Sequence, residues 1–342
     1  MYKFKNDYSE GAHPQLLEAL LKYNLDQQNG YSEDNYTEKA KSNIKKYING
    51  KCDIHFIPGG TQTNLIAITA FLRPHEACIA AKTGHIVDHE TGAIEATGHK
   101  VINVNTPNDG KLTPTLIKPI LDYHHFEHMV KPKLVYISNS TEIGTVYTKN
   151  ELKNLYEFCQ NNNLYLYIDG ARLGNAILAS DVNLQDMYNY SDAFFIGGTK
   201  NGALLGEALI IKNLDIKDEI RYIIKQRGAL IAKGRIMGIQ FNELFKNNLY
   251  FELASHANKM ANILTTELKK LGCKFLVDSP TNQIFPIIDN KIIENLLKEF
   301  DFYVWEKFDE NSSVIRLVTS WATPVKEVYN FIEEYKNNIK KR

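Results

Sequence analysis

The stretch that decides the fold is LYLYIDGARLGNAILASDVNLQDMYNYSDAFFIGGTKNG, residues 164–202. Two runs rich in aromatic and β-branched residues, 164–169 and 193–198, have strand length and are separated by a longer segment. The first run ends at Asp169, and the second leads directly to Lys200. Ligands of open parallel sheets bind outside the carboxyl ends of the strands. The pattern therefore predicts an α/β domain with Asp169 and Lys200 at its ligand-binding edge.

The same alternation of short strand-like runs and longer amphipathic stretches extends over residues 54–212 and predicts a mostly parallel sheet. After about residue 240, long helices rich in lysine and glutamate alternate with short strands. This change predicts a larger domain over residues 1–240 and a smaller α+β domain over 241–342. The other strand-like runs of the larger domain are 54–57, 134–138 and 207–212. The later helices are expected at 251–272 and 291–300, with strands at 274–277, 283–288 and 314–320.

The composition is that of a globular protein without a global electrostatic field. The 342 residues include 40 Lys plus Arg and 40 Asp plus Glu, so we expect neither nucleic acid nor a membrane surface as a partner. We find no apolar run of signal-peptide or membrane-span length. The four cysteines are scattered singly, which predicts reduced thiols and a cytoplasmic location. The His124, His125 and His128 cluster is interpreted as a solvated helix end, and no metal site is expected.

A glycine-rich turn, PGGTQTN at 58–64, follows the run at 54–57 and opens an apolar helix, so its N–H groups and Thr61 hydroxyl form a candidate phosphate site. Lys200 lies between glycines and a threonine, and such a lysine becomes a nucleophile toward a carbonyl when it is partly desolvated. Each feature alone also fits an ordinary turn, cap or surface lysine. Together with the carboxylate of Asp169 they match the needs of pyridoxal 5′-phosphate (PLP): a lysine, an acid for the ring nitrogen and a phosphate cradle.

Seven segments along nearly the whole chain resemble the threonine aldolase group of the β-eliminating lyases, which are fold-type I PLP enzymes. IDGAR followed by GGTKNG is the specific part of the resemblance, and NDYSEGAHP is moderately specific. The segments are NDYSEGAHP (6–14), IPGGTQTN (57–64), GHIVDHETGAIEATGHKV (84–101), STEIGTVYT (140–148), IDGARLGNA (168–176), GGTKNGALLGEA (197–208) and IRLVTSWAT (315–323). The resemblance implies a seven-stranded, mostly parallel sheet in the larger domain, with residues 1–20 contributing to the active site.

The resemblance also implies roles for individual residues. Lys200 carries the cofactor as a Schiff base, and Asp169 pairs with the pyridine nitrogen. The remaining roles are phosphate binding by Gly60 and Thr61, stacking over the ring by His85, and binding of the substrate carboxylate by Asn6, Arg172 and Arg316. A guanidinium suits the last task because it grips a carboxylate with two donors.

Two positions match the family less closely. Lys233 is the best match to a basic residue that reaches the phosphate, across a subunit interface, although Lys225, Arg227 or Arg235 could do the same. Glu142 stands where family members often have a histidine near the substrate hydroxyl. A carboxylate can also take a proton from a hydroxyl, so the aldol chemistry is kept while the preferred substrate is left open.

The leading hypothesis is a PLP-dependent aldolase that cleaves L-β-hydroxy-α-amino acids such as threonine, allo-threonine or phenylserine to glycine and an aldehyde. Glu142, His85 or a bound water is the base that takes the hydroxyl proton. The alternatives are another PLP-dependent amino-acid lyase, a β-eliminase, a racemase or an aminotransferase on the same fold, or a scaffold without the cofactor. Because sites of this fold are commonly completed by a neighbouring subunit, a homodimer or homotetramer with shared active sites is expected.

Overall fold

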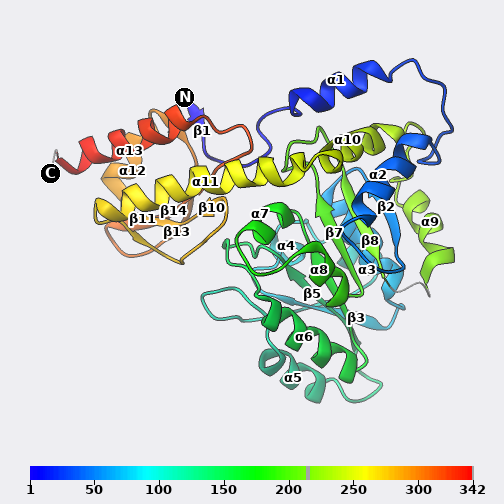
Figure 1. The fold of residues 1–342 in the computed structure, drawn as a ribbon. Helices are drawn as coiled ribbons and strands as arrows, with labels where there is room; N and C mark the ends of the chain where they lie inside the picture. Colours follow the sequence, from blue (N-terminus) through cyan, green and yellow to red (C-terminus); the bar gives the residue numbers. More distant parts are fainter. Residues whose placement is uncertain (213–215, 341–342) are drawn as a thin grey trace.

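The computed structural model describes residues 1–212 and 216–340, and Figure 1 shows a larger and a smaller unit joined by the long helix α11 (Leu249–Lys270). The larger unit is built on a seven-stranded sheet with the strand order β2-β8-β7-β6-β5-β3-β4. Strand β8 runs antiparallel to the other six strands, which all run in one direction. Its strands are β2 (Asp53–Ile57), β3 (Glu76–Ala81), β4 (Val101–Val104), β5 (Lys131–Ser138), β6 (Tyr165–Asp169), β7 (Ala193–Gly197) and β8 (Glu207–Ile211). The predicted mostly parallel, seven-stranded sheet is confirmed.

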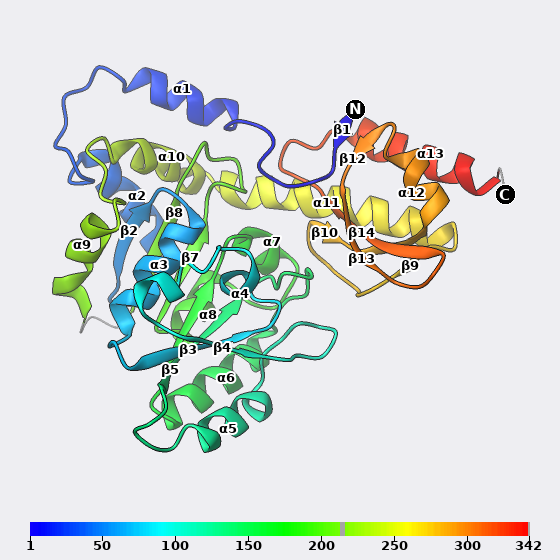
Figure 2. The ribbon, with the colours of Figure 1, turned by 180° about the vertical axis from the view of Figure 1, so that it is seen from behind.

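Helices cover both faces of the large sheet, because side chains alternate between two apolar layers along each buried strand. On β5, for example, Val135 and Ile137 pack on one face while Leu134 and Tyr136 pack on the other. Figure 2 shows α3 in front of the sheet, and buried side chains of α3 and α9 belong to the same apolar layer on the second face. The helices of this unit are α1 (Pro14–Lys22), α2 (Asn35–Lys45), α3 (Gly60–Phe71), α4 (His85–Asp88), α5 (Pro114–Tyr123), α6 (Lys149–Asn161), α7 (Leu173–Leu178), α8 (Leu184–Asn189), α9 (Lys217–Gln226) and α10 (Arg235–Lys246), with a 3₁₀ turn at Glu95–Thr97.

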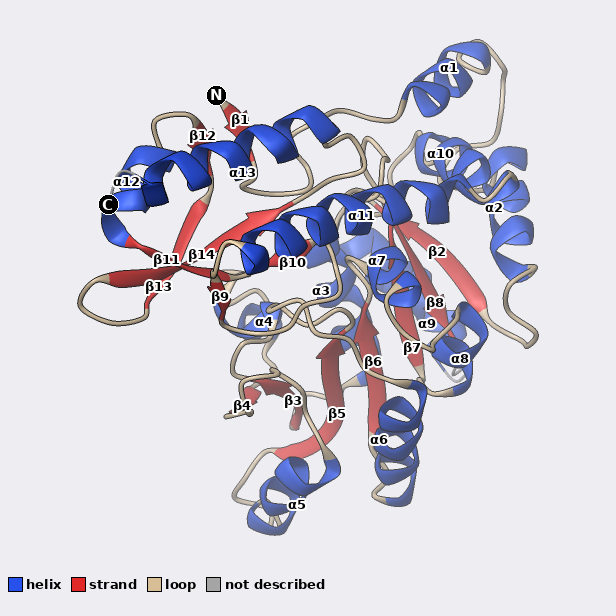
Figure 3. Cartoon of the chain, turned by 60° about the vertical axis from the view of Figure 1, so that its left-hand side comes forward, coloured by secondary structure: helices blue, strands red, loops and turns tan. Residues whose placement is uncertain are grey.

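The smaller unit has an antiparallel sheet with helices packed against it, as Figure 3 shows. Its strand order is β10-β14-β11-β9, and β13 also pairs with β14. The strands are β9 (Lys274–Phe275), β10 (Gln283–Ile284), β11 (Pro286–Asp289), β13 (Tyr303–Lys307) and β14 (Ser312–Val318), and the helices are α11 (Leu249–Lys270), α12 (Asn290–Leu296) and α13 (Val325–Lys340). The predicted smaller α+β unit is confirmed.

The N-terminal residues lie against the smaller unit, and both chain ends are found there in Figure 1. The short strand β1 (Tyr2–Lys3) pairs in parallel with β12 (Phe300–Asp301), and Phe4 is fully buried in the core of that unit. Helix α11 contributes to the cores of both units. The chain segment that follows Phe4 is therefore held between the two units. The division near residue 240 stays a prediction.

The strands of the larger unit include all the expected runs and two further strands. The runs expected at 54–57, 134–138, 164–169, 193–198 and 207–212 form strands β2, β5, β6, β7 and β8, whereas β3 and β4 were not predicted.

Within the described residues, no helix is both long and apolar enough to cross a bilayer.

The ends of β6 and β7 approach each other so closely that only glycine fits between them. The Gly197 N–H donates to the Gly170 carbonyl at 2.9 Å. A Cβ atom built on Gly170 would lie 1.8 Å from the backbone oxygen of Phe195. A flexible side chain could move away from such a clash, but the backbone of a strand cannot.

We therefore expect Gly170→Ala to lower the free energy of unfolding by about 1–3 kcal/mol or more, the usual cost of overpacking. Gly11→Ala is the matched control, because nothing lies within 4 Å of a Cβ there. Thermal unfolding of the two variants and the wild type checks this. Equal midpoints for Gly170→Ala and Gly11→Ala would contradict it.

Candidate active site

A cavity of ≈ 460 Å³ lies where the carboxyl ends of the large sheet face the smaller unit. Five of the residues singled out in the sequence line it together: His85, Glu142, Arg172, Lys200 and Arg316. Its remaining walls come from Tyr8, His89 and the β13 residues Tyr303, Val304 and Trp305. The larger sheet, the N-terminal segment and the smaller sheet thus all contribute to one site.

Lys200 follows β7 in the tight turn that the glycines of its motif allow. Burial and the nearby positive charge of Arg172 lower the pKa of its ammonium group, against the opposing effects of Asp7 and Glu142. Among the residues that the structure describes, Lys200 forms no ion pair, and its Nζ lies 6.0 Å from the ring centre of Tyr8. A lysine with a lowered pKa and a free nitrogen has the properties of a nucleophile toward a carbonyl group.

Asp169 ends β6 as predicted and is 4% exposed. Its Oδ2 accepts hydrogen bonds from Tyr136 Oη at 2.7 Å and from Asn64 Nδ2 at 3.0 Å. Its Oδ1 accepts from the Ala171 N–H at 2.9 Å. A carboxylate oxygen accepts about two hydrogen bonds, so Oδ1 retains a free position. Asp169 is therefore firmly oriented and can still receive a ring N–H.

The predicted phosphate turn forms the amino end of α3. The Thr63 hydroxyl donates to the Gly59 carbonyl at 2.9 Å, while a Cβ built on Gly59 or Gly60 would meet nothing within 4 Å. The start of this 12-residue helix therefore has open space beside Gly59 and Gly60, and Thr61 is exposed there. This arrangement fits a phosphate group.

The basic residues considered for the phosphate occupy different places. The carbonyl of Arg227 accepts a hydrogen bond from Gln62, inside the phosphate turn, at 2.8 Å, and its Nε is buried without a partner. Lys225 lies 4.7 Å from the ring centre of Tyr31, and the Arg235 guanidinium donates to backbone carbonyls near residue 25. Lys233 is exposed. Of the four, Arg227 lies beside the turn in the same chain, and the role of Lys233 stays a prediction.

His85 begins α4 and is paired with a buried carboxylate that the sequence interpretation missed. Its Nδ1 lies 2.8 Å from Glu90 Oε1, which also accepts from Asn64 Nδ2 at 2.7 Å. Burial alone lowers the pKa of His85, but the hydrogen bond to Glu90 and the charges of Glu142 and Asp169 raise it overall. His85 is therefore more often protonated at neutral pH than an ordinary histidine.

Arg172 holds a carboxylate of the same chain. Its Nε and one terminal nitrogen donate to the two oxygens of Asp7 at 2.7 and 3.0 Å, and both side chains are buried. Burial raises the pKa of Asp7, but Arg172 and Lys200 outweigh it and lower this pKa below its ordinary value. Asn6, the neighbour named in the sequence, instead accepts hydrogen bonds within its own turn from the Tyr8 N–H and the Ser9 hydroxyl, each at 3.0 Å.

Of the two arginines that line the cavity, Arg316 on β14 is the one without a carboxylate partner among the described residues. One terminal nitrogen donates to Gln283 Oε1 at 2.6 Å, the guanidinium lies 5.3 Å from the ring centre of Trp305, and Nε is buried without a partner. Burial and the repulsion of Arg172 lower the pKa of Arg316. Arg316 is half-buried, and among the described residues its side chain donates a hydrogen bond only to the neutral Gln283, so its positive charge is available to a carboxylate that enters the cavity.

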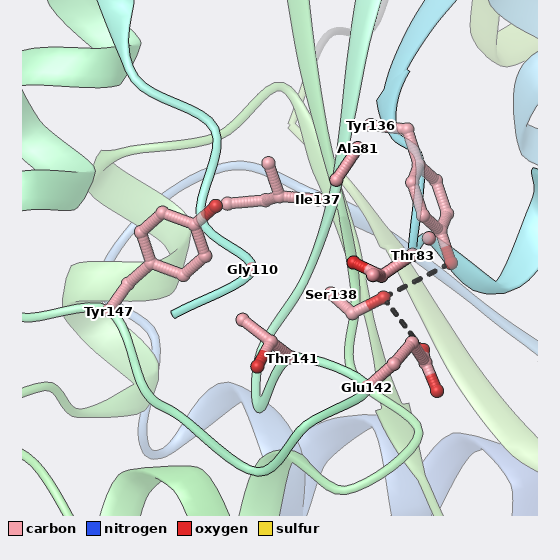
Figure 4. A pocket seen from close by; sticks show the side chains of 10 residues that line it. Ala81, Thr83, Gly110, Tyr136, Ile137, Ser138, Thr141, Glu142 and Tyr147 are labelled. Carbon is pink, nitrogen blue, oxygen red and sulfur yellow. Dashed lines mark hydrogen bonds between the residues drawn. The ribbon is translucent and has the colours of Figure 1, made fainter. Parts of the chain in front are cut away.

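Glu142 lies in the loop after β5 and lines both the large cavity and a smaller one beside it. Figure 4 shows its carboxylate next to Ser138, whose hydroxyl donates to Glu142 Oε1 at 3.2 Å. Glu142 and His85 therefore both face the space in which a substrate would lie.

The residues that the sequence interpretation missed lie mostly inside the motifs it used. Asp7 belongs to NDYSEGAHP, Asn64 to IPGGTQTN and Glu90 to the segment around His85. Glu207 belongs to GGTKNGALLGEA and begins β8, and its Oε2 accepts a hydrogen bond from the Gly198 N–H at 2.9 Å behind the Lys200 turn. Burial raises the pKa of Glu207 to about 7, although Lys200 opposes this.

The raised pKa of Glu207 makes the stability of the Lys200 turn dependent on pH. A carboxyl whose folded-state pKa is raised favours the folded state below the ordinary pKa, and this contribution is lost as the pH rises through the folded pKa, here about 7. We expect Glu207→Gln, whose amide oxygen still accepts from Gly198, to lose less stability than the wild type between pH 5 and 8. Thermal unfolding midpoints across this range give the difference, and parallel curves would contradict the assignment.

Comparisons with known proteins give a consistent result. A profile described as Beta-eliminating lyase matches residues 6–291. The chain is 29% identical over 332 residues to a low specificity L-threonine aldolase of Pseudomonas aeruginosa, covering 95% of this chain and 94% of that protein. It is similar to a solved structure of Leishmania major threonine aldolase, with 49% identity, a TM-score of 0.97 and coverage of 99% and 100%. An aromatic aminotransferase of Pyrococcus horikoshii shares only the fold, at 15% identity, a TM-score of 0.73 and coverage of 100% and 96%.

Proposed function

This chain belongs to the β-eliminating lyase family, and from that premise we propose that it is a PLP-dependent threonine aldolase. It cleaves L-β-hydroxy-α-amino acids of the threonine, allo-threonine and phenylserine type to glycine and an aldehyde. The observation that carries the proposal is the single cavity that holds Lys200, Arg316 and two candidate proton acceptors, Glu142 and His85. The similarity to L-threonine aldolases along nearly the whole chain supports it.

The described residues fit the cofactor. Lys200 with its lowered pKa suits the aldehyde, and Asp169 has an acceptor position left for the ring nitrogen. Gly60 and Thr61 at the open amino end of α3 suit the phosphate, and His85 beside Glu90 suits the ring face. When bound, PLP supplies an electron sink for the bond that breaks at the amino acid Cα.

The arginines orient the amino acid. Arg316 supplies an unpaired guanidinium for the substrate carboxylate, while Arg172, tied to Asp7, adds positive charge from a fixed position. Holding the carboxylate at one end selects which Cα bond is set for cleavage. A direct contact of Asn6 with the carboxylate stays a prediction.

Glu142 is the better acceptor for the hydroxyl proton. A general base must be unprotonated at the working pH. The raised pKa of His85 keeps that imidazole partly protonated, which suits stacking and charge balance more than proton uptake. Glu142 lines the cavity directly, and its Oε1 accepts a hydrogen bond from a hydroxyl instead of pairing with a charged group.

The first test is aldehyde release from L-threonine, L-allo-threonine and phenylserine by the purified protein with PLP. We expect activity, and we expect Lys200→Ala to reduce kcat by about 1,000-fold or more, because a residue that forms a covalent bond to the reacting group is lost. Lys153→Ala, an exposed lysine on α6, is the matched control and should keep full activity. Borohydride reduction and peptide mass spectrometry should place the cofactor on Lys200.

Production of ammonia and a keto acid instead of glycine would redirect the assignment to a β-eliminase or a related PLP enzyme. A protein that takes up no PLP would contradict it altogether.

We further propose that the protein acts as a homodimer or homotetramer with shared sites in the cytoplasm. All four cysteines are free and buried, which agrees with a reducing compartment. Lys233 is exposed, in the segment that precedes α10, and a basic side chain there is available to reach the phosphate of a partner.

Mixing two variants, at a PLP concentration that loads the wild type but leaves Lys233→Ala largely unloaded, tests the shared site. If Lys233 completes the partner's site, Lys233→Ala weakens PLP binding by about 10-fold or more, the cost of one charge-assisted hydrogen bond. Refolded mixtures of Lys233→Ala and Lys200→Ala subunits then regain activity, since one site of each mixed dimer contains both lysines. No recovery in mixtures that gel filtration shows to be dimers or larger would contradict the role of Lys233.

A further inference from the structure

Two hydroxyl groups connect the carboxyl groups of Glu142 and Asp169. Ser138 Oγ lies 3.2 Å from Glu142 Oε1, and Tyr136 Oη lies 3.3 Å from Ser138 Oγ. Tyr136 Oη lies 2.7 Å from Asp169 Oδ2. Figure 4 shows the first two of these contacts. We call Ser138 and Tyr136 the hydroxyl chain.

The local structure holds the hydroxyl chain in place. Tyr136 and Ser138 are two residues apart on β5, so their side chains point to the same face of the sheet. Ser138 is paired with Asp169 in the register of β5 and β6. Tyr136 is fully buried, and Ser138 and Asp169 are 8% and 4% exposed. Water therefore has little access to replace either hydroxyl.

The three contacts need three hydrogens, but the two hydroxyl groups supply only two. When both carboxylates are ionised, Tyr136 donates to Asp169 and Ser138 donates to Glu142, so nothing bridges the two hydroxyl oxygens. One added proton on Glu142 completes the set. Glu142 then donates to Ser138, Ser138 turns to donate to Tyr136, and Tyr136 still donates to Asp169.

We propose that Ser138 and Tyr136 are positioning residues that stabilise the protonated form of Glu142. This rests on the proposed function, in which the substrate hydroxyl gives up a proton. That proton forms a bond to a Glu142 oxygen, and the O–H bonds of Ser138 and Tyr136 stay intact. Only the Ser138 hydroxyl reorients, and the chain leaves the hydrogen bond on Asp169 unchanged.

The phenol cannot itself supply the proton. Burial and the charge of Asp169 raise the pKa of Tyr136 well above its ordinary value, so it keeps its hydrogen. The ionisable groups that line the cavity with Glu142 are Tyr8, Tyr303, His85, His89, Arg172, Lys200 and Arg316. They come from other segments of the chain, and variants of the hydroxyl chain leave all of them in place.

The test uses infrared spectra of the full-length protein with PLP at a series of pH values. The band of the protonated Glu142 carboxyl is identified by its absence in Glu142→Gln. Tyr136→Phe removes the acceptor of the reoriented Ser138 hydroxyl, so the pH of half-protonation of Glu142 should fall by about 0.5–1 unit, the value of one hydrogen bond. In a Ser138→Ala background, adding Tyr136→Phe should cause no further shift.

An equal shift in both backgrounds, or no shift in either, overturns the proposal, because Tyr136 then acts on Glu142 through space or not at all. Ser138→Ala alone gives a second measurement, since the Glu142 acid band must change frequency when its partner is removed. An unchanged band also overturns the proposal. None of these spectra requires turnover, so loss of the aldolase assignment would be seen separately, in the aldehyde assay.

Discussion

The close approach of the β6 and β7 backbones at Gly170 and Gly197 is the constraint on which the site depends. A Cβ on Gly197 would lie 2.3 Å from the Ala171 carbonyl, so neither strand end could keep its path with a larger residue. This approach brings the turns that follow the two strands together, and with them Asp169 and Lys200. In the proposed function, one PLP molecule contacts both groups, Asp169 through its ring nitrogen and Lys200 through its aldehyde. The backbone contacts at Gly170 and Gly197 thus determine how Asp169 and Lys200 lie relative to each other.

Some of the charged side chains at the cavity are paired within the chain, and others are not. Arg172 is neutralised by Asp7, and His85 is paired with Glu90. Within the described part of the chain, Lys200 and Arg316 have no carboxylate partner. Burying a cation without compensation costs stability, and this cost is removed when an anionic group arrives. In the proposed function, a substrate carboxylate bound at Arg316 would balance one of these two charges.

The sequence was sufficient for the architecture where strands are rich in aromatic and β-branched residues. It failed for β3, whose residues Glu76–Ala81 read EACIAA, and for the four-residue β4. Small buried residues give no periodic signal, because both faces of β3 are covered. Tertiary packing, which no local pattern records, makes this segment a strand.

The site was predictable wherever one residue type is required by the chemistry, as for Lys200 and Asp169. It was less predictable for the residues that hold these groups in place. Asp7 and Asn6 are neighbours, and only the backbone decides that Asp7 reaches Arg172 while Asn6 turns to its own loop. Glu207 lies at the start of a strand, and nothing in the sequence beside it indicates that it accepts a hydrogen bond from the Gly198 N–H.

The supporting residues also explain why two nearby groups can take different parts in proton chemistry. His85 and Glu142 face the same cavity, but His85 is held by a carboxylate and Glu142 by a hydroxyl. A carboxylate partner favours the charged imidazolium, whereas a hydroxyl can donate to an ionised carboxylate and accept from a protonated one. Glu142 therefore keeps a hydrogen-bond partner in both of its states. Glu142 has a hydrogen-bond partner before and after it accepts a proton, so it is suited to proton transfer. The partner of His85 favours only the protonated imidazole, so His85 is suited to keep its proton.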